Sequence, residues 1–584
     1  MKFPQSFVGV VLLGATCAYA QNEDFILKAM KDEVQRAKTL RLPGLDAPYY
    51  TQYMIEDADV LLASATLGGL LSSSHSPLRI QDVKVRVGDY KFDNTNYVFS
   101  QAFGGARYDT DQLPLETNYL GLRHILWLAT DRVFKTAEEG IAHKKSALKN
   151  VNLPEVLPDF SKAEPTRSLL PTPRKAVDEA LWKKRTVDLS AVFAAYPEVQ
   201  ASAVEFQSVQ STNYFVNTEG AEVRDPDNLA FFRIRGYAQA TDGATVRDAE
   251  VVEAWDVTGL PSDADMRRSA TQVAETVTAL AHAPQGFAYD GPVLFEGRAS
   301  AQLFGQMLGD NLKLSRKPVP EPGRPTPYLA SELETRVGSR ILPDWMDVVD
   351  DPTQTEHRGQ QLLGHYEIDL EGVRPKPLTL VEHGVLKDFF RTRTPALKGF
   401  EGSNGHARMP GSYGADAASI GNLFVRASQT MPAGDLKKKL IELCKQRNKP
   451  YGIMVRKLDW PSSASFEELR REVSGMAMSG GGSRPVSIPL LVYRVYPDGK
   501  EELVRGVRFR GLSTRSLKDI VAASDQAYVY NYIDSTAPFA LMGAGGFVTN
   551  ATVVAPAVLF DEVELEQVLD EMPNPPIVPP PPTS

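Results

Sequence analysis

The sequence predicts an α+β protein of two domains, with a mixed α/β N-terminal domain followed by a mostly β C-terminal domain. The chain has 584 residues, which fits roughly two to four domains rather than one core. Long helical patterns and alternating strand patterns occur together before about residue 283, whereas Gly-rich strand signals dominate after it. With 42% hydrophobic and 23% charged residues, the composition is that of a globular protein and excludes a wholly disordered chain.

The first twenty residues have the three parts of a secretory signal peptide. Lys2 gives a positive start, residues 7–14 form an apolar stretch, and Ala18-Tyr19-Ala20 is a small-residue cleavage site. We therefore expect residues 1–20 to be removed after Ala20 and the mature chain to be periplasmic or secreted. No later stretch reaches the roughly 18 apolar residues of a membrane span, so we expect no transmembrane segment.

The expected N-terminal domain, 21–283, begins with helices and strands in turn. Apolar residues at helical spacing predict a helix over 27–37, and the alternation of valines with polar residues predicts a strand over 83–88. A longer helical pattern covers 122–145. The polar, Pro-rich segment 154–173 is predicted to be a surface connection.

A second group of strands precedes the domain boundary. Alternation predicts strands over 204–208 and 231–235, and 214–220 reads as a strand that runs into a Gly turn. Ser262 and Asp265 have the spacing of a capping box, which predicts a helix reaching about residue 280. Ala283-Pro284 then marks the expected boundary.

The expected C-terminal domain, 284–570, is mostly β. A short helix is predicted near 299–308, and an amphipathic helix over 435–446 interrupts the strand signals. The tail 571–584 contains four consecutive prolines, which predict an extended, disordered segment.

Charge, cysteines and histidines limit the possible chemistry. The net charge of −9 gives no overall attraction to phosphates, so we expect no nucleic-acid partner. The two cysteines exclude a disulfide scaffold and a Cys-rich zinc module. Four of the eight histidines lie between 357 and 406, at spacings that fit no compact metal motif: His357, His365, His383 and His406. His383 is predicted to occupy a hairpin tip.

Several segments, in order along the chain, resemble one known family. They are NTEG at 217–220, GPVLFEGRASA at 291–301, IDLEG at 368–372, TLVEHGVL at 379–386, GSNGHAR at 402–408 and VAPAVLFDEVEL at 554–565. The sequence from residue 283 onward resembles the C-terminal domain of the TldD/PmbA family, which is metallopeptidase-related and also called modulators of DNA gyrase. The resemblance covers most of 200–566 and is weaker over 21–200. It implies the two-domain TldD/PmbA fold.

The chain departs from the family at the metal motif. Active members carry H-E-x-x-x-H on a key helix, where two His bind zinc and the Glu activates water, and a later Cys completes the ligand set. The matching positions here are Ala301, Gln302 and Gln306, and 536–554 contains no Cys. Ala has no donor atom, and a neutral glutamine amide is a poor zinc ligand and no general base. We therefore expect no catalytic residue, no metal and no cofactor at these positions.

The resemblance is closest to the metal-less PmbA/TldE-like class, here with a signal peptide. It implies a pseudoenzyme that binds extended peptides and forms a homodimer, or a heterodimer with a TldD-like paralogue that carries H-E-x-x-x-H. The candidate residues of the substrate groove are Gly305, His365, Glu371, Gly372, His406, Arg408 and Gly481.

Two alternatives remain open at this point. The first is an active zinc metallopeptidase with a displaced site, in which His357, His365 or His406 acts with a carboxylate such as Glu371. The second is a structural or secretion-linked factor that keeps only the fold.

Overall fold

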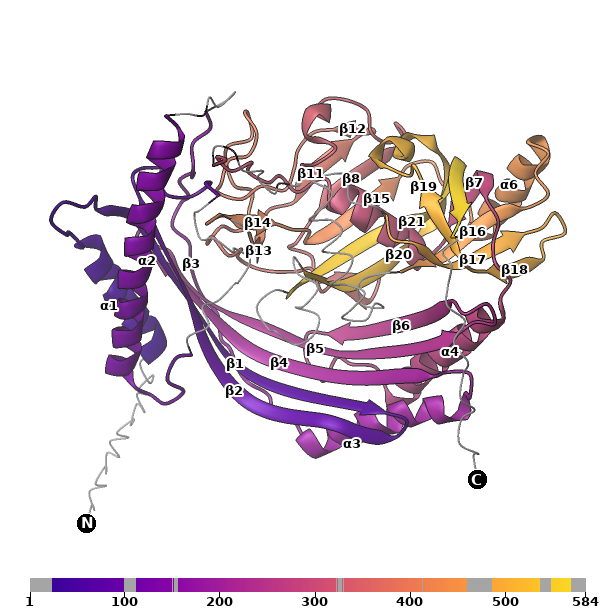
Figure 1. Ribbon diagram of the computed structural model, residues 1–584, viewed down its shortest axis with the longest axis horizontal. Helices are drawn as coiled ribbons and strands as arrows, with labels where there is room; N and C mark the ends of the chain where they lie inside the picture. The colour runs from indigo at the N-terminus through magenta and orange to yellow at the C-terminus, as the bar shows by residue number, and fades with distance from the viewer. Residues whose placement is uncertain are drawn as a thin grey trace, which may run out of the picture.

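A curved sheet of long strands holds a second, β-rich part of the chain against its concave face, as the computed structural model in Figure 1 shows. The structure describes residues 24–98, 112–149, 151, 156–321, 323, 328, 330–411, 413–459, 486–535 and 548–568. The predicted signal peptide 1–20, Gly481 and the tail 571–584 lie outside these residues.

The N-terminal sheet has the order β2-β1-β4-β5-β3, with β6 paired to β5. All its pairs are antiparallel except β3 with β5. Its strands are β1 (Pro48–Thr66), β2 (Gly69–Val87), β3 (Arg167–Leu169), β4 (Ala201–Asn217), β5 (Glu222–Gln239) and β6 (Thr245–Ala254). The strands predicted around 83, 204, 214 and 231 are therefore confirmed.

Four helices cover the convex face of this sheet, two at each end: α1 (Phe25–Lys38), α2 (Tyr119–Ala147), α3 (Glu179–Ser190) and α4 (Asp263–His282). Side chains alternate along each strand, so Phe206 and Phe232 pack outward against Trp182 of α3. The predicted helices at 27–37, 122–145 and 262–280 are confirmed. Ser262 caps α4, since its hydroxyl accepts the Asp265 N–H at 3.2 Å.

An eleven-stranded sheet forms the C-terminal part, in the order β12-β11-β8-β15-β21-β7-β16-β17-β18, with β19 and β20 also paired to β21. Its strands are β7 (Tyr289–Phe295), β8 (Met346–Asp350), β11 (Leu378–Glu382), β12 (Val385–Leu386), β15 (Asn422–Ala427), β16 (Gly452–Leu458), β17 (Pro489–Val495), β18 (Glu501–Val504), β19 (Val507–Arg510), β20 (Ile520–Ser535) and β21 (Val548–Gln567). Two short pairs stand apart from it, β9 (Glu356–His357) with β10 (Gln360–Gln361) and β13 (Ala407–Pro410) with β14 (Asp416–Ala418).

The described residues of this part include two α-helices, α5 (Arg298–Phe304) and α6 (Ala433–Gln446). They confirm the short helix and the amphipathic helix expected from the sequence. His383 and Gly384 have positive φ at the β11–β12 turn, which confirms the predicted hairpin tip. No helix among the described residues is long and apolar enough to cross a bilayer.

Ion pairs join the two sheets across their facing surfaces. Lys457 of β16 donates to Asp248 of β6 at 2.6 Å. Arg298, in the first turn of α5, forms a two-pronged ion pair with Glu250 of the same strand. These contacts tie α5 and β16 to β6, which pairs with β5 at the edge of the N-terminal sheet.

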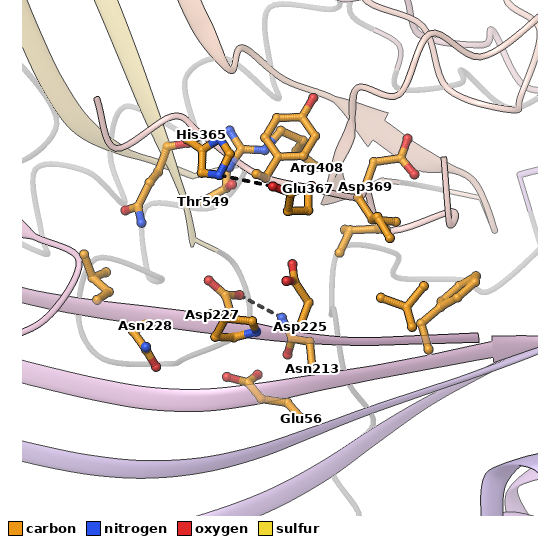
Figure 2. Close-up of a pocket in the computed structure, with 18 of the residues that line it drawn as sticks. Glu56, Asn213, Asp225, Asp227, Asn228, His365, Glu367, Asp369, Arg408 and Thr549 are labelled. Atoms are coloured by element: carbon orange, nitrogen blue, oxygen red, sulfur yellow. Dashed lines mark hydrogen bonds and ion pairs between the residues drawn. The ribbon is translucent and has the colours of Figure 1, made fainter. Parts of the chain in front are cut away.

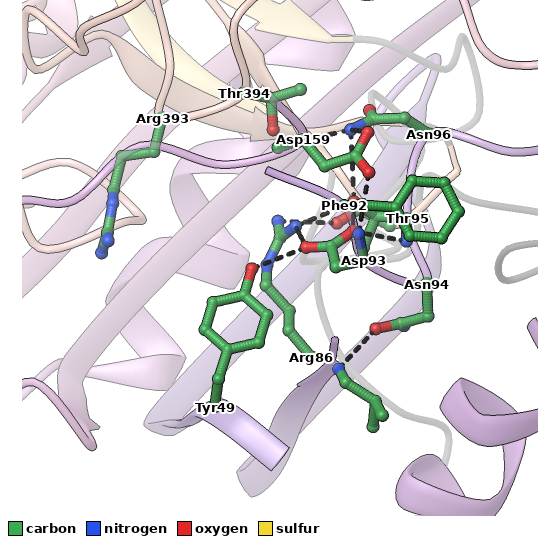
Figure 3. A network of polar contacts seen from close by, with 12 residues as sticks. Tyr49, Arg86, Phe92, Asp93, Asn94, Thr95, Asn96, Asp159, Arg393 and Thr394 are labelled. Atoms are coloured by element: carbon green, nitrogen blue, oxygen red, sulfur yellow. Dashed lines mark hydrogen bonds and ion pairs between the residues drawn. The ribbon is translucent and has the colours of Figure 1, made fainter. Parts of the chain in front are cut away.

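The segment 154–173, predicted to be a surface connection, is exposed or half-buried at most of its described residues, but two adjacent ones enter the interior. Asp159 and Phe160 are buried, and residues 167–169 form β3. The Asp159 carboxylate accepts the Lys144 ammonium of α2 at 2.6 Å and the Asp93 N–H at 2.8 Å, within the polar network of Figure 3. The Arg86 guanidinium, paired with Asp93 at 2.8 Å, lies 3.8 Å from the centre of the Phe160 ring. Charges from four separate segments thus satisfy one another in the core.

Candidate functional site

Helix α5 and the π turn that continues it contain the three positions that the sequence resemblance matches to the family's metal motif. Ala301 is fully buried in the core of the C-terminal part, and Gln302 is 1% exposed. Gln306 lies in a single π turn, Gly305–Gly309, that continues α5. Gly305, expected in a substrate groove, is itself buried there.

Both glutamine side chains form hydrogen bonds with neighbouring segments. The Gln302 carbonyl accepts the Leu458 N–H at 2.8 Å, and its amide donates to the Leu458 carbonyl and to the Tyr530 hydroxyl, each at 3.4 Å. The Gln306 carbonyl accepts the Ser487 N–H at 3.0 Å, and its amide donates to the Ser487 hydroxyl at 2.6 Å. The two amides therefore connect α5 to the end of β16 and to the segment before β17.

These residues do not fit a zinc ion. Ala301 offers no donor atom, and the carbonyl oxygens of Gln302 and Gln306 already accept main-chain hydrogen bonds. Elsewhere in the described part of the chain, no three His, Cys, Asp or Glu side chains converge as ligands.

The histidines of the 357–406 segment lie in different environments. His406 is fully buried with Asp350, and its Nε2 lies 3.0 Å from the Asp350 carboxylate. His357 packs against Phe424, and burial lowers its pKa. His365 contacts the Pro352 carbonyl through Nδ1 at 2.7 Å. His406, expected in the groove, thus lies in the core, whereas His365 lines a cavity.

The segment 368–372 forms a tight turn that presses against the N-terminal sheet. The Asp369 carboxylate accepts the N–H groups of Glu371, Val373 and Ala407 at 3.0, 2.8 and 3.1 Å, and burial raises its pKa to about 6. Gly372 has φ +80°, and a Cβ there would lie 2.7 Å from the Phe215 ring. The glycine therefore permits close contact between the two parts.

Glu371 of this turn is buried beside the Arg393 main chain, whose N–H it accepts at 2.5 Å. Burial raises the pKa of Glu371 to about 8, and the nearby carboxylates of Asp416 and Asp369 add to the shift. Glu371 and Gly372 thus adjoin the cavity described next without being among the residues that line it.

A cavity of about 370 Å³ lies between the concave face of the N-terminal sheet and the loop that contains residues 363–370 (Figure 2). Its floor is formed by side chains of β1, β4 and β5, and its roof by the loop, Arg408 and the start of β21. Of the groove residues predicted from sequence, His365 and Arg408 line it. Arg408 donates to the carbonyls of Ile420 at 2.7 Å and Asn550 at 2.5 Å, and its guanidinium lies 4.2 Å from the centre of the Tyr366 ring.

Most acidic residues of the cavity were not predicted. They are Glu56, Asp225, Asp227 and Glu367, together with the turn residue Asp369. Asp225 and Asp227 occupy alternate positions of β5, so both face the concave side. The available signal was two carboxylates at alternate positions of a strand, on the same side as the apolar Val223 and Leu229.

Residues 289–567 match the PmbA/TldA metallopeptidase C-terminal domain family. A shorter stretch of 82 residues is 35% identical to a metalloprotease of Archaeoglobus fulgidus. That alignment covers 14% of this chain and 18% of the relative, so the chain spans less than a fifth of that protein in the match.

Solved structures share the fold over nearly the whole chain. A Thermotoga maritima protein described as a modulator of DNA gyrase superposes with a TM-score of 0.55 at 16% identity, covering 92% of this chain and 99% of that one. TldE from Thermococcus kodakarensis gives 0.54 at 13% identity, covering 92% and 100%. At these identities the likeness establishes the fold, an α/β N-terminal region followed by a β-rich C-terminal region.

Proposed function

We propose that this chain, whose residues 289–567 match the PmbA/TldA metallopeptidase C-terminal domain, is a non-catalytic, peptide-binding member of that family. It works without zinc at α5 and acts outside the cytoplasm after removal of residues 1–20. Its partner is a second copy of the chain or a paralogue with an intact H-E-x-x-x-H helix.

The observation that carries the proposal is the state of α5. A zinc peptidase needs ligands and a carboxylate base on this helix, whereas the chain has Ala301, Gln302 and Gln306. Each of the two glutamine side chains both donates and accepts hydrogen bonds, and these bonds connect the helix to neighbouring segments. The helix has thus acquired a supporting role that a metal site would disrupt.

Peptide binding is supported by the cavity between the two parts of the chain. It combines apolar side chains with many polar and charged ones, so it offers both kinds of contact to a peptide. The partner is supported only by the family, in which metal-less and metal-containing chains pair.

The experiment is to mix the purified mature chain with a peptide mixture and to measure both binding and the mass of every peptide afterwards. We expect reproducible retention of a subset of peptides with all masses unchanged. Zinc-dependent cleavage by the chain alone would overturn the proposal, and so would failure to retain any peptide, alone or after reconstitution with the paralogue.

A further inference from the structure

The cavity of Figure 2 is lined by more acidic than basic side chains. Five carboxylates line it: Glu56, Asp225, Asp227, Glu367 and Asp369. Arg408 contributes a guanidinium to the wall, and it donates hydrogen bonds to the main-chain carbonyls of Ile420 and Asn550. His365 lies 3.7 Å from Glu367, which also pairs with Arg374 at 3.3 Å.

Asp225 stands out among these carboxylates. Within the described part of the chain, its side chain forms no hydrogen bond or ion pair, whereas the neighbouring Asp227 accepts the Asn213 amide at 2.9 Å. Burial raises the pKa of Asp225 to about 7, and the carboxylates of Asp227 and Glu367 add to the shift. A half-buried acid between two others gains most from a cation placed beside it.

A second, independent group in the cavity also lacks a partner. Asn550, at the start of β21, lines the cavity and is 8% exposed. Its side-chain oxygen has no hydrogen-bond partner among the described residues. An unpaired buried acceptor costs roughly 1–3 kcal/mol, so a ligand with N–H donors would relieve it.

The remaining lining suits the stem of a long side chain. Apolar surface comes from Met54, Val209, Phe215, Leu229, Trp255 and Leu363. Lys and Arg place their aliphatic stems on apolar surface while the charged end meets polar groups. The cavity offers both surfaces side by side.

From this combination we infer that the cavity receives a positively charged nitrogen group of a bound peptide. The group is an alkylammonium or guanidinium, supplied by a Lys or Arg side chain or by the free α-amino end. The inference rests on the proposed peptide-binding function and adds the class of peptide: basic peptides are favoured over neutral and acidic ones.

The test uses matched peptides on the full mature chain, with affinity measured by titration calorimetry. One series varies a central residue between lysine, norleucine and glutamate, and each peptide is made with a free and an acetylated N-terminus. If a side chain supplies the cation, lysine binds at least about tenfold more tightly than norleucine whether or not the N-terminus is acetylated. If the α-amino end supplies it, acetylation weakens binding by that factor instead.

Variants test whether the preference for the cationic peptide arises at Asp225. Asp225→Asn should reduce the preference for the cation to about threefold or less. It should fold, because it replaces an unpaired half-buried acid with a neutral amide. Asp131→Asn, an exposed position on α2, is the control and should leave the preference unchanged. If Asp225→Asn fails to fold, Glu367→Gln provides a second variant of the cavity in which the preference for lysine over norleucine can be measured.

The possible failures are distinct. If peptides bind but lysine, norleucine and glutamate are equivalent with both termini, the cation site is wrong and peptide binding stands. The same holds if Asp225→Asn and Glu367→Gln both keep the full preference. If no peptide binds, the proposed function itself fails.

Discussion

The side chain of Gln302 and the main chain of Leu458 are joined by two hydrogen bonds, one in each direction. Leu458 is the last residue of β16, and the residue opposite it in β17 is Pro489, which has no N–H to donate. The Gln302 amide donates to the Leu458 carbonyl at 3.4 Å and accepts its N–H at 2.8 Å. A side chain on α5 thus completes the edge of a strand at a position where the family carries a catalytic Glu.

Removal of this side chain should weaken the fold. Gln302→Ala leaves the N–H and the carbonyl of Leu458 without partners in the core, so we expect a loss of about 2–4 kcal/mol in the free energy of unfolding. Urea denaturation followed by circular dichroism measures it. Gln446→Ala, which removes an exposed amide of α6, should change stability by less than about 0.5 kcal/mol. Equal effects for the two variants would show that the hydrogen bonds between Gln302 and Leu458 contribute little to the free energy of unfolding.

The family's own residue should also be poorly tolerated there. In Gln302→Glu, the carboxylate can accept the Leu458 N–H but cannot donate to the Leu458 carbonyl. A buried charge facing an acceptor predicts a lower melting temperature at neutral pH, partly recovered in acid as the carboxyl becomes protonated. A melting curve that is unchanged across this pH range would contradict the prediction.

The buried ion pair between Lys144 and Asp159 gives a third prediction. Lys144→Met leaves the Asp159 carboxylate buried without its ammonium partner, so we expect a loss of about 3–5 kcal/mol. The matched control is Lys135→Met, which breaks the exposed pair with Asp131 on the same helix and should cost about 0–1 kcal/mol. Chemical denaturation of both variants separates the two cases, and similar losses would argue against a structural role of the network in Figure 3.

Glu371 should make stability depend on pH. Its pKa is raised from 4.5 to about 8 in the folded protein, so the folded state holds the proton more tightly than the unfolded state does. The resulting stability is fully present below pH 4.5 and is lost as the pH rises through about 8. Glu371→Gln should therefore raise the free energy of unfolding by about 1–2 kcal/mol at alkaline pH and change it little in acid. Glu442→Gln, at an exposed position of α6, should show no such pH dependence.

Binding of a basic peptide should strengthen as the pH rises through about 7, where Asp225 loses its proton. The charged or titratable groups around Asp225 are Asp227 on the same strand, Glu56 on β1, Glu367 and Arg374 of the facing loop, and His365 and Arg408 of the roof. Calorimetry of the lysine peptide across this range checks the sign, and Asp225→Asn should flatten the profile. A profile that is flat or weakens with rising pH would contradict the prediction.

Local signals predicted the regular elements well. The helix at 119–147 and the capped helix α4 follow from apolar spacing and from Ser262, because both signals lie within the element itself. The interior course of Asp159 and Phe160 was missed because their partners, Lys144, Arg86 and Arg393, come from segments far apart in the sequence. Proline and polar content describe only the local segment and cannot predict burial that depends on distant residues.

The candidate site could be predicted in part. The resemblance pointed to α5 and to the loops at 365–372 and 406–408, and the structure brings His365 and Arg408 to one cavity. It could not separate them from His406, whose pairing with Asp350 depends on the packing of β8 beside β15. Asp225 and Asp227 carry no motif, and their role arises only when β5 faces the loop across the cavity.

The central claim is that α5 no longer holds a catalytic metal. The most direct measurement is the metal content of the purified mature chain by mass spectrometry, with and without added zinc, together with peptidase activity before and after a chelator. We expect less than about 0.1 zinc or iron per chain, no gain on zinc addition and no chelator-sensitive cleavage. One tightly bound metal per chain, lost with the activity on chelation, would contradict the account.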